Sequence, residues 1–275
     1  MRFGLAIPQY GFSLPTGEIR FVDAVEWARR AEELGFDSVW LSEHLFYSFG
    51  RYGADPRPIA ALEPLTALAG VAAATAHVRM GVIVMPAALR PAGLVAKAAS
   101  TLDRLSGGRF DLGLGAGWLE DEFTAFGYRF GSVGDRFATL ERVVPEIIRM
   151  TSDPASPLPR PVQDPLPIWV GGKGGPRLLR LAARHAAGWN TVWRHSPDAH
   201  EAAVADVALA CEREGRDPAT FRRNIGLYGI VGSTEEEART RFERARASFP
   251  GDAMRDETWE SWRADTLSGS PEQVI

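Results

Sequence analysis

The hydrophobic positions along the chain form short, nearly continuous apolar runs that alternate with amphipathic segments. Runs of this kind are typical of parallel strands that are covered on both faces. Seven segments are therefore predicted to be strands: Phe3–Ile7, Ser38–Leu41, Arg79–Val84, Phe110–Leu114, Ile168–Val170, Trp189–Trp193 and Ile225–Val231.

The segments between these runs carry the spacing of helices. Two sets of apolar residues recur at intervals of three and four, which places each set on one helix face. Gly35 and the pair Gly107 and Gly108 stand where helices are expected to end, and Pro176 suits a first helical turn. The two periodic sets are Phe21, Ala24, Val25 and Ala28, and Leu94, Ala98, Thr101, Leu102 and Leu105.

A regular alternation of strand and helix predicts an α/β fold. Seven such units in one chain favour a (β/α)8 TIM barrel over an open sheet, with residues 1–275 as a single domain. The eighth strand is not evident. The chain reaches "GSPEQVI" just inside the helix expected before that strand, so we expect the last helix and strand to be missing. The Pro-rich segment Thr151–Pro167 predicts an extended surface connection.

Composition narrows the classes of partner. The formal net charge is −4 and no run is rich in Lys or Arg, which argues against nucleic acid and anionic membranes as partners. The chain shows no signal peptide and no apolar segment of membrane-spanning length, and the single cysteine, Cys211, lies in an Ala-rich helical stretch where packing is its expected role. A reduced, cytoplasmic protein is the expectation.

Chemistry in such a barrel is expected where each strand ends. Gln9 follows the first predicted strand, and Glu43 and His44 follow the second. A carboxylate next to an imidazole at a strand end is a candidate catalytic pair, although a lone histidine is often structural. The other histidines lie on other elements, no metal-ligand spacing is present and no GxSxG elbow exists, so metal and acyl-enzyme chemistry are not expected.

Two glycine clusters follow the fourth and fifth predicted strands. Glycine lets backbone amides approach a ligand closely, and successive amides next to a helix start can bind an anion. Lys173 adds a positive charge to the second cluster. The sequence therefore predicts a ligand with a phosphate group, while each cluster alone is also compatible with a tight turn. The clusters are Gly115 and Gly117, and Gly171, Gly172, Gly174 and Gly175.

Several blocks of sequence, in order along nearly the whole chain, resemble the bacterial-luciferase-like superfamily of flavin and deazaflavin oxidoreductases. The most specific is the long block around "TLDRLSGGR". The others are "SVWLSEHLF", "RFATLERVVPEI", "PLPIWVGG" and "GSPEQV".

The resemblance implies a barrel that binds coenzyme F420 or FMN. It places His44 and Glu43 near the cofactor ring, and Ile83 and Val84 at a bulge of the third strand, where Ile83–Val84 is the position of a non-prolyl cis peptide bond. Gln9, Ile83, Val84 and Met85 are expected to belong to the same cofactor site. Ala116, Gly117 and Trp118 would line the ring next to Gly115, while Gly171, Gly172, Lys173 and Gly174 would hold the phosphate.

The coenzyme decides the reaction that is expected. The resemblance favours an F420-dependent oxidoreductase that transfers hydride to or from a small organic substrate. Trp118 stands where sugar-phosphate dehydrogenases of the family carry a carboxylate, so an apolar, aromatic or carbonyl-bearing substrate is expected. An FMN-dependent monooxygenase served by a separate reductase and a barrel that binds a ligand without turnover remain alternatives. The resemblance also implies a homodimer.

Overall fold

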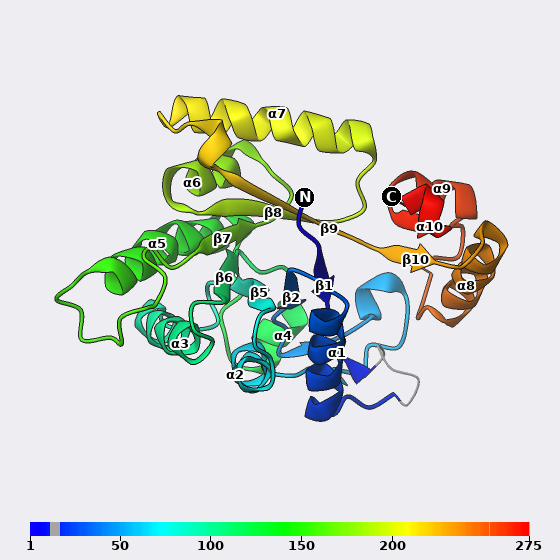
Figure 1. Cartoon of the computed structure of the whole chain (residues 1–275), viewed down its shortest axis with the longest axis horizontal. Helices are drawn as coiled ribbons and strands as arrows, with labels where there is room; N and C mark the ends of the chain where they lie inside the picture. Colours follow the sequence, from blue (N-terminus) through cyan, green and yellow to red (C-terminus); the bar gives the residue numbers. More distant parts are fainter. Residues whose placement is uncertain (12–16, 253, 275) are drawn as a thin grey trace.

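The computed structural model describes residues 1–11, 17–252 and 254–274. Its centre is a seven-stranded sheet in the order β1-β2-β5-β6-β7-β8-β9, and every neighbouring pair is parallel (Figure 1). The strands are β1 (Gly4–Ala6), β2 (Ser38–Leu41), β5 (Arg79–Pro86), β6 (Phe110–Gly115), β7 (Ile168–Gly171), β8 (Gly188–Trp193) and β9 (Arg222–Leu227). All seven predicted strands are thus present, as an incomplete barrel in which β1 and β9 are the edges.

Helices connect consecutive strands and contact one another in sequence around the sheet, α1 with α2, α2 with α3, α3 with α5, α5 with α6 and α6 with α7. Parallel strands require such crossovers. The helices are α1 (Phe21–Glu33), α2 (Pro64–Ala74), α3 (Ala92–Leu105), α4 (Glu120–Ala125), α5 (Val133–Ser152), α6 (Pro176–His185) and α7 (Pro197–Arg213). Gly35 has a positive φ just after α1, and Pro176 is the first residue of α6, as the sequence predicts.

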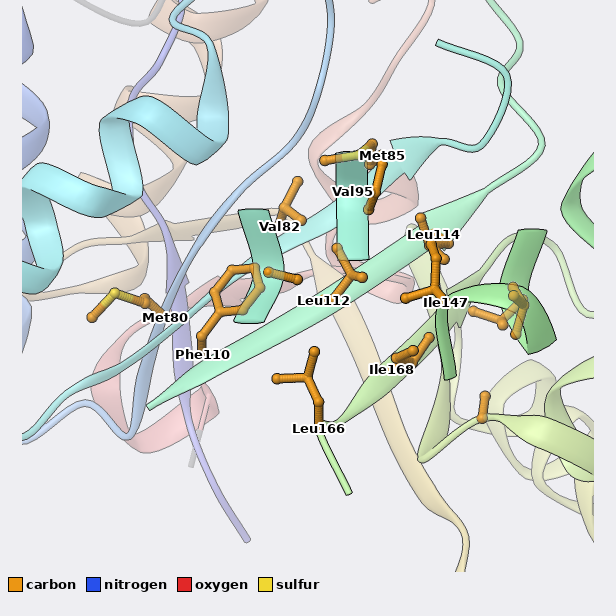
Figure 2. Close-up of a cluster of buried hydrophobic side chains, with 14 of the residues drawn as sticks. Met80, Val82, Met85, Val95, Phe110, Leu112, Leu114, Ile147, Leu166 and Ile168 are labelled. Carbon is orange, nitrogen blue, oxygen red and sulfur yellow. The ribbon is translucent and has the colours of Figure 1, made fainter. Parts of the chain in front are cut away.

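The main hydrophobic core lies between the strands and these helices. Figure 2 shows its centre, where Leu112 and Leu114 of β6 lie near Met85 of β5, Val95 of α3 and Ile147 of α5. Alternate residues of a strand point to opposite faces. The positions of β6 that do not face this core are Asp111, Gly113 and Gly115. They therefore face the inside of the barrel.

Tryptophans fill the amino-terminal half of the barrel interior where glycines leave room. A Cβ atom on Gly81 would clash with the ring of Trp40, and one on Gly188 would lie 2.7 Å from Cζ3 of Trp169. The two rings meet edge to face with centroids 6.4 Å apart, and Trp169 Nε1 donates to Asp111 Oδ1 at 3.0 Å. This layer closes the barrel below and leaves the carboxyl ends of the strands as the place for a ligand.

The chain leaves the main sheet at Tyr228. The sequence predicts one strand over Ile225–Val231, but the structure has β9 and a separate strand β10 (Gly229–Val231). The break arises because Tyr228 N donates to Trp193 O while Tyr228 O accepts from Leu267 N, so the backbone changes partner there. β10 pairs in parallel with β11 (Leu267–Gly269).

A small carboxyl-terminal unit forms around these two strands. It contains α8 (Glu235–Ser248), α9 (Trp259–Ala264) and α10 (Pro271–Val274), which gather beyond the end of β9 (Figure 1). Phe242, Trp259 and Trp262 are the large residues of its own buried cluster. As the sequence predicts, the main sheet of the described residues has no eighth strand. The additional strand β11 ends at Gly269, the first residue of "GSPEQV", and pairs with β10, so the edge of β1 stays open.

The Pro-rich segment forms the extended connection predicted from the sequence. After α5 ends at Ser152, residues 153–167 make this connection, and Asp103 Oδ2 fastens it by accepting hydrogen bonds from the amides of Val162 and Gln163.

Among the residues that the structure describes, no helix is both long and apolar enough to cross a membrane.

Candidate active site

The loops after β1 and β2 are joined at the mouth of the barrel by a buried amide. Gln9 Oε1 accepts from Ser42 N at 2.6 Å, and Gln9 Nε2 donates to Ser42 O at the same distance. The Tyr10 hydroxyl lies 2.7 Å from Ser42 Oγ. Gln9 is 2% exposed, so the amide expected to bind the cofactor instead fixes the turn that leads to Glu43 and His44.

His44 is held by a carboxylate from a different element. Its Nδ1 lies 3.1 Å from Glu122 Oε1, while Glu122 Oε2 accepts from Leu45 N at 2.7 Å. Glu122 is fully buried on the short helix α4. Buried carboxylates require such partners because an unpaired charge away from water is strongly disfavoured. Glu122 therefore fixes both the ring and the backbone at the end of β2.

Glu43 points into a separate ion cluster. Its Oε1 pairs with Arg90 Nη1, and Arg90 Nη2 donates to Glu63 Oε1 at 2.7 Å. Burial raises the pKa of Glu43, with Arg90 opposing the rise. The two members of the candidate pair therefore have different partners: successive side chains leave an extended backbone in opposite directions, and Glu122, not Glu43, lies against His44.

Aromatic rings surround the imidazole. Tyr47 and Trp118 meet the His44 ring edge to face, with centroids 5.3 and 5.5 Å away, and Tyr10 lies at 6.2 Å. The Arg51 guanidinium lies 4.6 Å from the Trp118 centroid. Tyr47 belongs to the strand β3 (Phe46–Tyr47), which pairs with β4 (Ile59–Ala60) in the loop after β2. Tyr47 of this loop thus lies against His44.

β5 carries the predicted bulge. Its pairing with β6 shifts between Val82 and Met85, and the Ile83–Val84 peptide bond is cis, at the position that the resemblance indicates. A Cβ atom on Gly115 would lie 2.5 Å from Val84 Cγ2, and one on Gly171 would clash with Val84 Cγ1. These two glycines therefore make room for Val84 inside the barrel.

Met85 lies elsewhere than the resemblance places it. Its side chain is fully buried in the main core, near Val95 (Figure 2), so it supports the bulge from behind.

The loop after β7 is open and ends at an uncapped helix. Gly172 and Lys173 are exposed, and Gly174 has φ +82°. Gly175, the N-cap of α6, supplies no side-chain acceptor for the first amides of that helix. The first-turn amides and Lys173 are the groups expected to hold a phosphate. Glycine at 172 and 174 also serves packing, since a Cβ there would approach Leu178 and Trp189.

The segment between β6 and α4 completes the mouth. Ala116 and Gly117 are half-buried, Gly117 has φ +79°, and Trp118 is exposed apart from its contacts with His44 and Tyr47. Glu122 and Arg90 are the two functional residues that sequence reasoning misses. The sequence does hold one hint of Glu122: it is the last residue of the acidic run "EDE", which follows shortly after the glycines at the end of the strand.

Fold and site together define a parallel α/β barrel of the TIM type, with a histidine and a bulged strand at its mouth. The profile of the luciferase-like monooxygenase family matches residues 1–275, and the chain belongs to this family.

Curated relatives include enzymes with different activities. A phthiodiolone/phenolphthiodiolone dimycocerosates ketoreductase from Mycobacterium sp. (strain JLS) is 31% identical over 78% of this chain and 64% of its own length. An F420-dependent glucose-6-phosphate dehydrogenase from Kineococcus radiotolerans is 36% identical over 74% of this chain and 62% of its own length. The chain thus spans less than two thirds of these relatives.

Solved structures show the same fold. An F420-dependent secondary alcohol dehydrogenase in complex with an F420-acetone adduct superposes with a TM-score of 0.80 at 18% identity, over 99% of this chain and 87% of the other. The monooxygenase RslO1 from Streptomyces bottropensis superposes with a TM-score of 0.74 at 27% identity, over 100% of this chain and 86% of the other.

Proposed function

We propose that this chain is an F420-dependent oxidoreductase that acts on a small organic substrate with a carbonyl or aromatic group. The observation that carries the proposal is the contact between His44 and the buried Glu122 at a barrel mouth that also holds the bulged strand β5. The dehydrogenase from Kineococcus radiotolerans, 36% identical, supports the choice of F420.

The residues at the mouth fit a cofactor with a flat ring and a phosphate. Val84 lies inside the barrel in front of Gly115 and Gly171, next to the segment Ala116–Trp118, and these residues would hold the ring. Gly172, Lys173 and Gly174, with the first amides of α6, would hold the phosphate. Bound F420 would supply or accept a hydride, which a protein side chain cannot do.

His44 is the group that can donate or accept a proton in this reaction. A carboxylate accepts hydrogen bonds but cannot donate them, so ionised Glu122 requires the hydrogen of His44 on Nδ1. Nε2 is then an acceptor in the neutral imidazole and a donor in the charged form. A hydrogen bond or proton from Nε2 can stabilise negative charge that develops on a substrate oxygen.

An FMN-dependent monooxygenase is the second candidate. It is favoured by a pyrimidine monooxygenase RutA from Klebsiella pneumoniae, 29% identical over 78% of this chain and 61% of its own length. Relatives with this fold use either cofactor. An FMN-dependent monooxygenase would require a source of reduced flavin, such as a separate reductase. A cytoplasmic homodimer remains the expected form of the protein.

Paired titrations test the proposal. The purified protein is titrated with F420 and, separately, with FMN, and binding is followed by fluorescence quenching. Tight binding of F420 with much weaker binding of FMN is the expected result. Preference for FMN would favour the monooxygenase. Binding of neither cofactor would point to a barrel that is not catalytic.

A further inference from the structure

Three aromatic rings are stacked where β8 and β9 end. Trp193 is the last residue of β8 and Tyr228 directly follows β9, and their rings are 5.2 Å apart with an interplanar angle of 19°. Trp262 of α9 continues the stack, 5.5 Å from Tyr228 at 23°. We call these three residues the aromatic stack.

Two of the three rings of the aromatic stack, the end ring Trp193 and the middle ring Tyr228, are exposed. Trp193 is 37% exposed and Tyr228 43% exposed, whereas Trp262 is buried. Within the part of the chain that the structure describes, Tyr228 is the ring that stacks on Trp193. Large aromatic side chains leave water favourably, so neighbouring rings that stay exposed at a strand end indicate a binding surface.

The inner end of the aromatic stack is rigidly anchored. Trp262 Nε1 donates to Ser268 Oγ at 3.0 Å. Arg194, next to Trp193, lies 5.3 Å from the Trp262 centroid and donates to Asp265 at 2.8 Å and to Glu257 at 2.5 Å. These contacts tie the end of β8 to the carboxyl-terminal unit. A preorganised surface binds a flat ligand with little loss of conformational freedom.

The aromatic stack and the rings around His44 lie at the same rim of the sheet. Trp193 and Tyr228 stand at the carboxyl ends of β8 and β9, and His44 follows the carboxyl end of β2 in the same parallel sheet. The ring of Tyr47, beside His44, lies 5.0 Å from that of Phe49, which lies 6.2 Å from that of Tyr52. Burial raises the pKa of Tyr228, and the proximity of Tyr52 adds to the rise.

We propose that the aromatic stack is the substrate-recognition surface and that the substrate carries a planar aromatic ring system, which stacks on Trp193. This inference rests on the proposed function, because it assigns the substrate class to the same site. It also assigns a task to the carboxyl-terminal unit, which supports the stack through Trp262 and Arg194. A saturated ring of equal carbon content is puckered and cannot stack on an indole in this way.

The test compares a flat and a puckered ligand by isothermal titration calorimetry of the whole chain. 2-Naphthol and 2-decalol share a carbon skeleton and a hydroxyl group, but only naphthol is planar. Both are measured on the unmodified protein and on Trp193→Leu, Trp193→Phe and Trp27→Leu. Trp27 is an exposed tryptophan of α1 and serves as the control. F420 is titrated into the same preparations.

The expected result is a preference for naphthol of roughly three- to tenfold, the range of one aromatic pair. This preference should vanish in Trp193→Leu and persist in Trp193→Phe and Trp27→Leu. Equal affinity for both compounds, binding of neither, or a preference that survives Trp193→Leu would overturn the proposal. If Trp193→Leu does not fold, equal affinity of the unmodified protein for the two compounds still overturns the proposal.

The two proposals fail in different ways. Absence of the naphthol preference in the unmodified protein, with normal F420 binding, rejects the aromatic stack as the recognition surface and leaves the proposed function intact. Failure to bind F420 with the naphthol preference retained rejects the cofactor assignment and leaves the recognition surface.

Discussion

Two walls of the barrel mouth are built on different principles. The wall at β2, β5 and β6 consists of buried polar side chains, each tied to a partner: Gln9 to Ser42, His44 to Glu122 and Glu43 to Arg90. The wall at β8 and β9 consists of exposed rings on Trp193 and Tyr228 that are supported from behind. The first wall has the arrangement needed for chemistry and the second that needed for recognition.

The difference has an energetic consequence. Buried charges are tolerated only while paired, so loss of one partner in the first wall destabilises the fold or misplaces a reacting group. Exposed rings contribute little to folding, so changes in the second wall should alter binding and leave the fold intact. The variants below test this division, from the largest expected effect to the smallest.

Arg90→Leu should be the most damaging change. It leaves the Glu43 carboxylate buried without its cation, and breaking such a pair costs about 3–5 kcal/mol in the free energy of unfolding at neutral pH. Urea unfolding measures this cost. Arg57→Leu, which removes an exposed pair with Asp55, is the control and should change stability by less than about 1 kcal/mol.

The same variant makes a prediction with pH. Burial already raises the pKa of Glu43, and removing Arg90 raises it further. A raised pKa in the folded state means that stability increases as pH falls and the carboxyl group is protonated. The deficit of Arg90→Leu relative to the unmodified protein should therefore shrink as pH is lowered. A deficit that stays constant with pH would show that Glu43 is not the group left unpaired.

Glu122→Gln should lower turnover with little effect on cofactor affinity. The amide can present its N–H to His44 Nδ1, which favours the wrong tautomer, and we expect kcat to fall about 100-fold. The absorbance of the cofactor follows the rate, and fluorescence quenching measures its affinity. Glu120→Gln, an exposed neighbour on α4, is the control. An unchanged kcat would show that the contact of Glu122 with His44 does not contribute to turnover.

Gly171→Ala should strain the bulge of β5, because its Cβ would clash with Val84. Overpacking of this kind costs about 1–3 kcal/mol in the free energy of unfolding. Adding Val84→Ala should relieve part of that cost, so the double variant is less destabilised than the sum of the single variants. Gly175→Ala, where an added Cβ meets nothing within 4 Å, should be silent. Strict additivity would contradict the packing of Val84 against Gly171.

Glu237→Gln should have the smallest effect, because it lies at the exposed start of α8 behind the second wall. Hydrogen bonds from Ser233 and the Arg241 guanidinium lower the pKa of Glu237 from 4.5 to about 2. A lowered pKa contributes stability above pH 4.5 that is lost as pH falls toward 2. The variant should melt slightly below the unmodified protein at pH 7 and together with it near pH 2. A constant difference in Tm would contradict this assignment.

The sequence predicts the main sheet well, because a strand buried on both faces needs an apolar residue at nearly every position. Its weakest point is the stretch after Ile225. The apolar run continues through Tyr228 to Val231, yet the strand changes partner there because Leu267 donates to Tyr228 O. No local pattern encodes that contact. β11, which pairs with β10, is not predicted for the same reason.

The site residues also differ in whether the sequence predicts them. His44 is predicted from its place at a strand end and from the family motifs, and the bulge at Ile83–Val84 from the family resemblance alone. Glu122, however, lies 78 positions from His44, so its role depends on how α4 packs. The glycines at 115 and 171 were expected to admit a ligand, but in the structure they make room for Val84.

The most direct test locates the ring hydrogen of His44 by ¹⁵N NMR, since the contact between His44 and Glu122 carries the proposed function. The expected result is a hydrogen on Nδ1 in the unmodified protein and a shift toward the Nε2 tautomer in Glu122→Gln. A His44 ring with its hydrogen on Nε2 alone in both proteins would contradict the proposed role of Glu122.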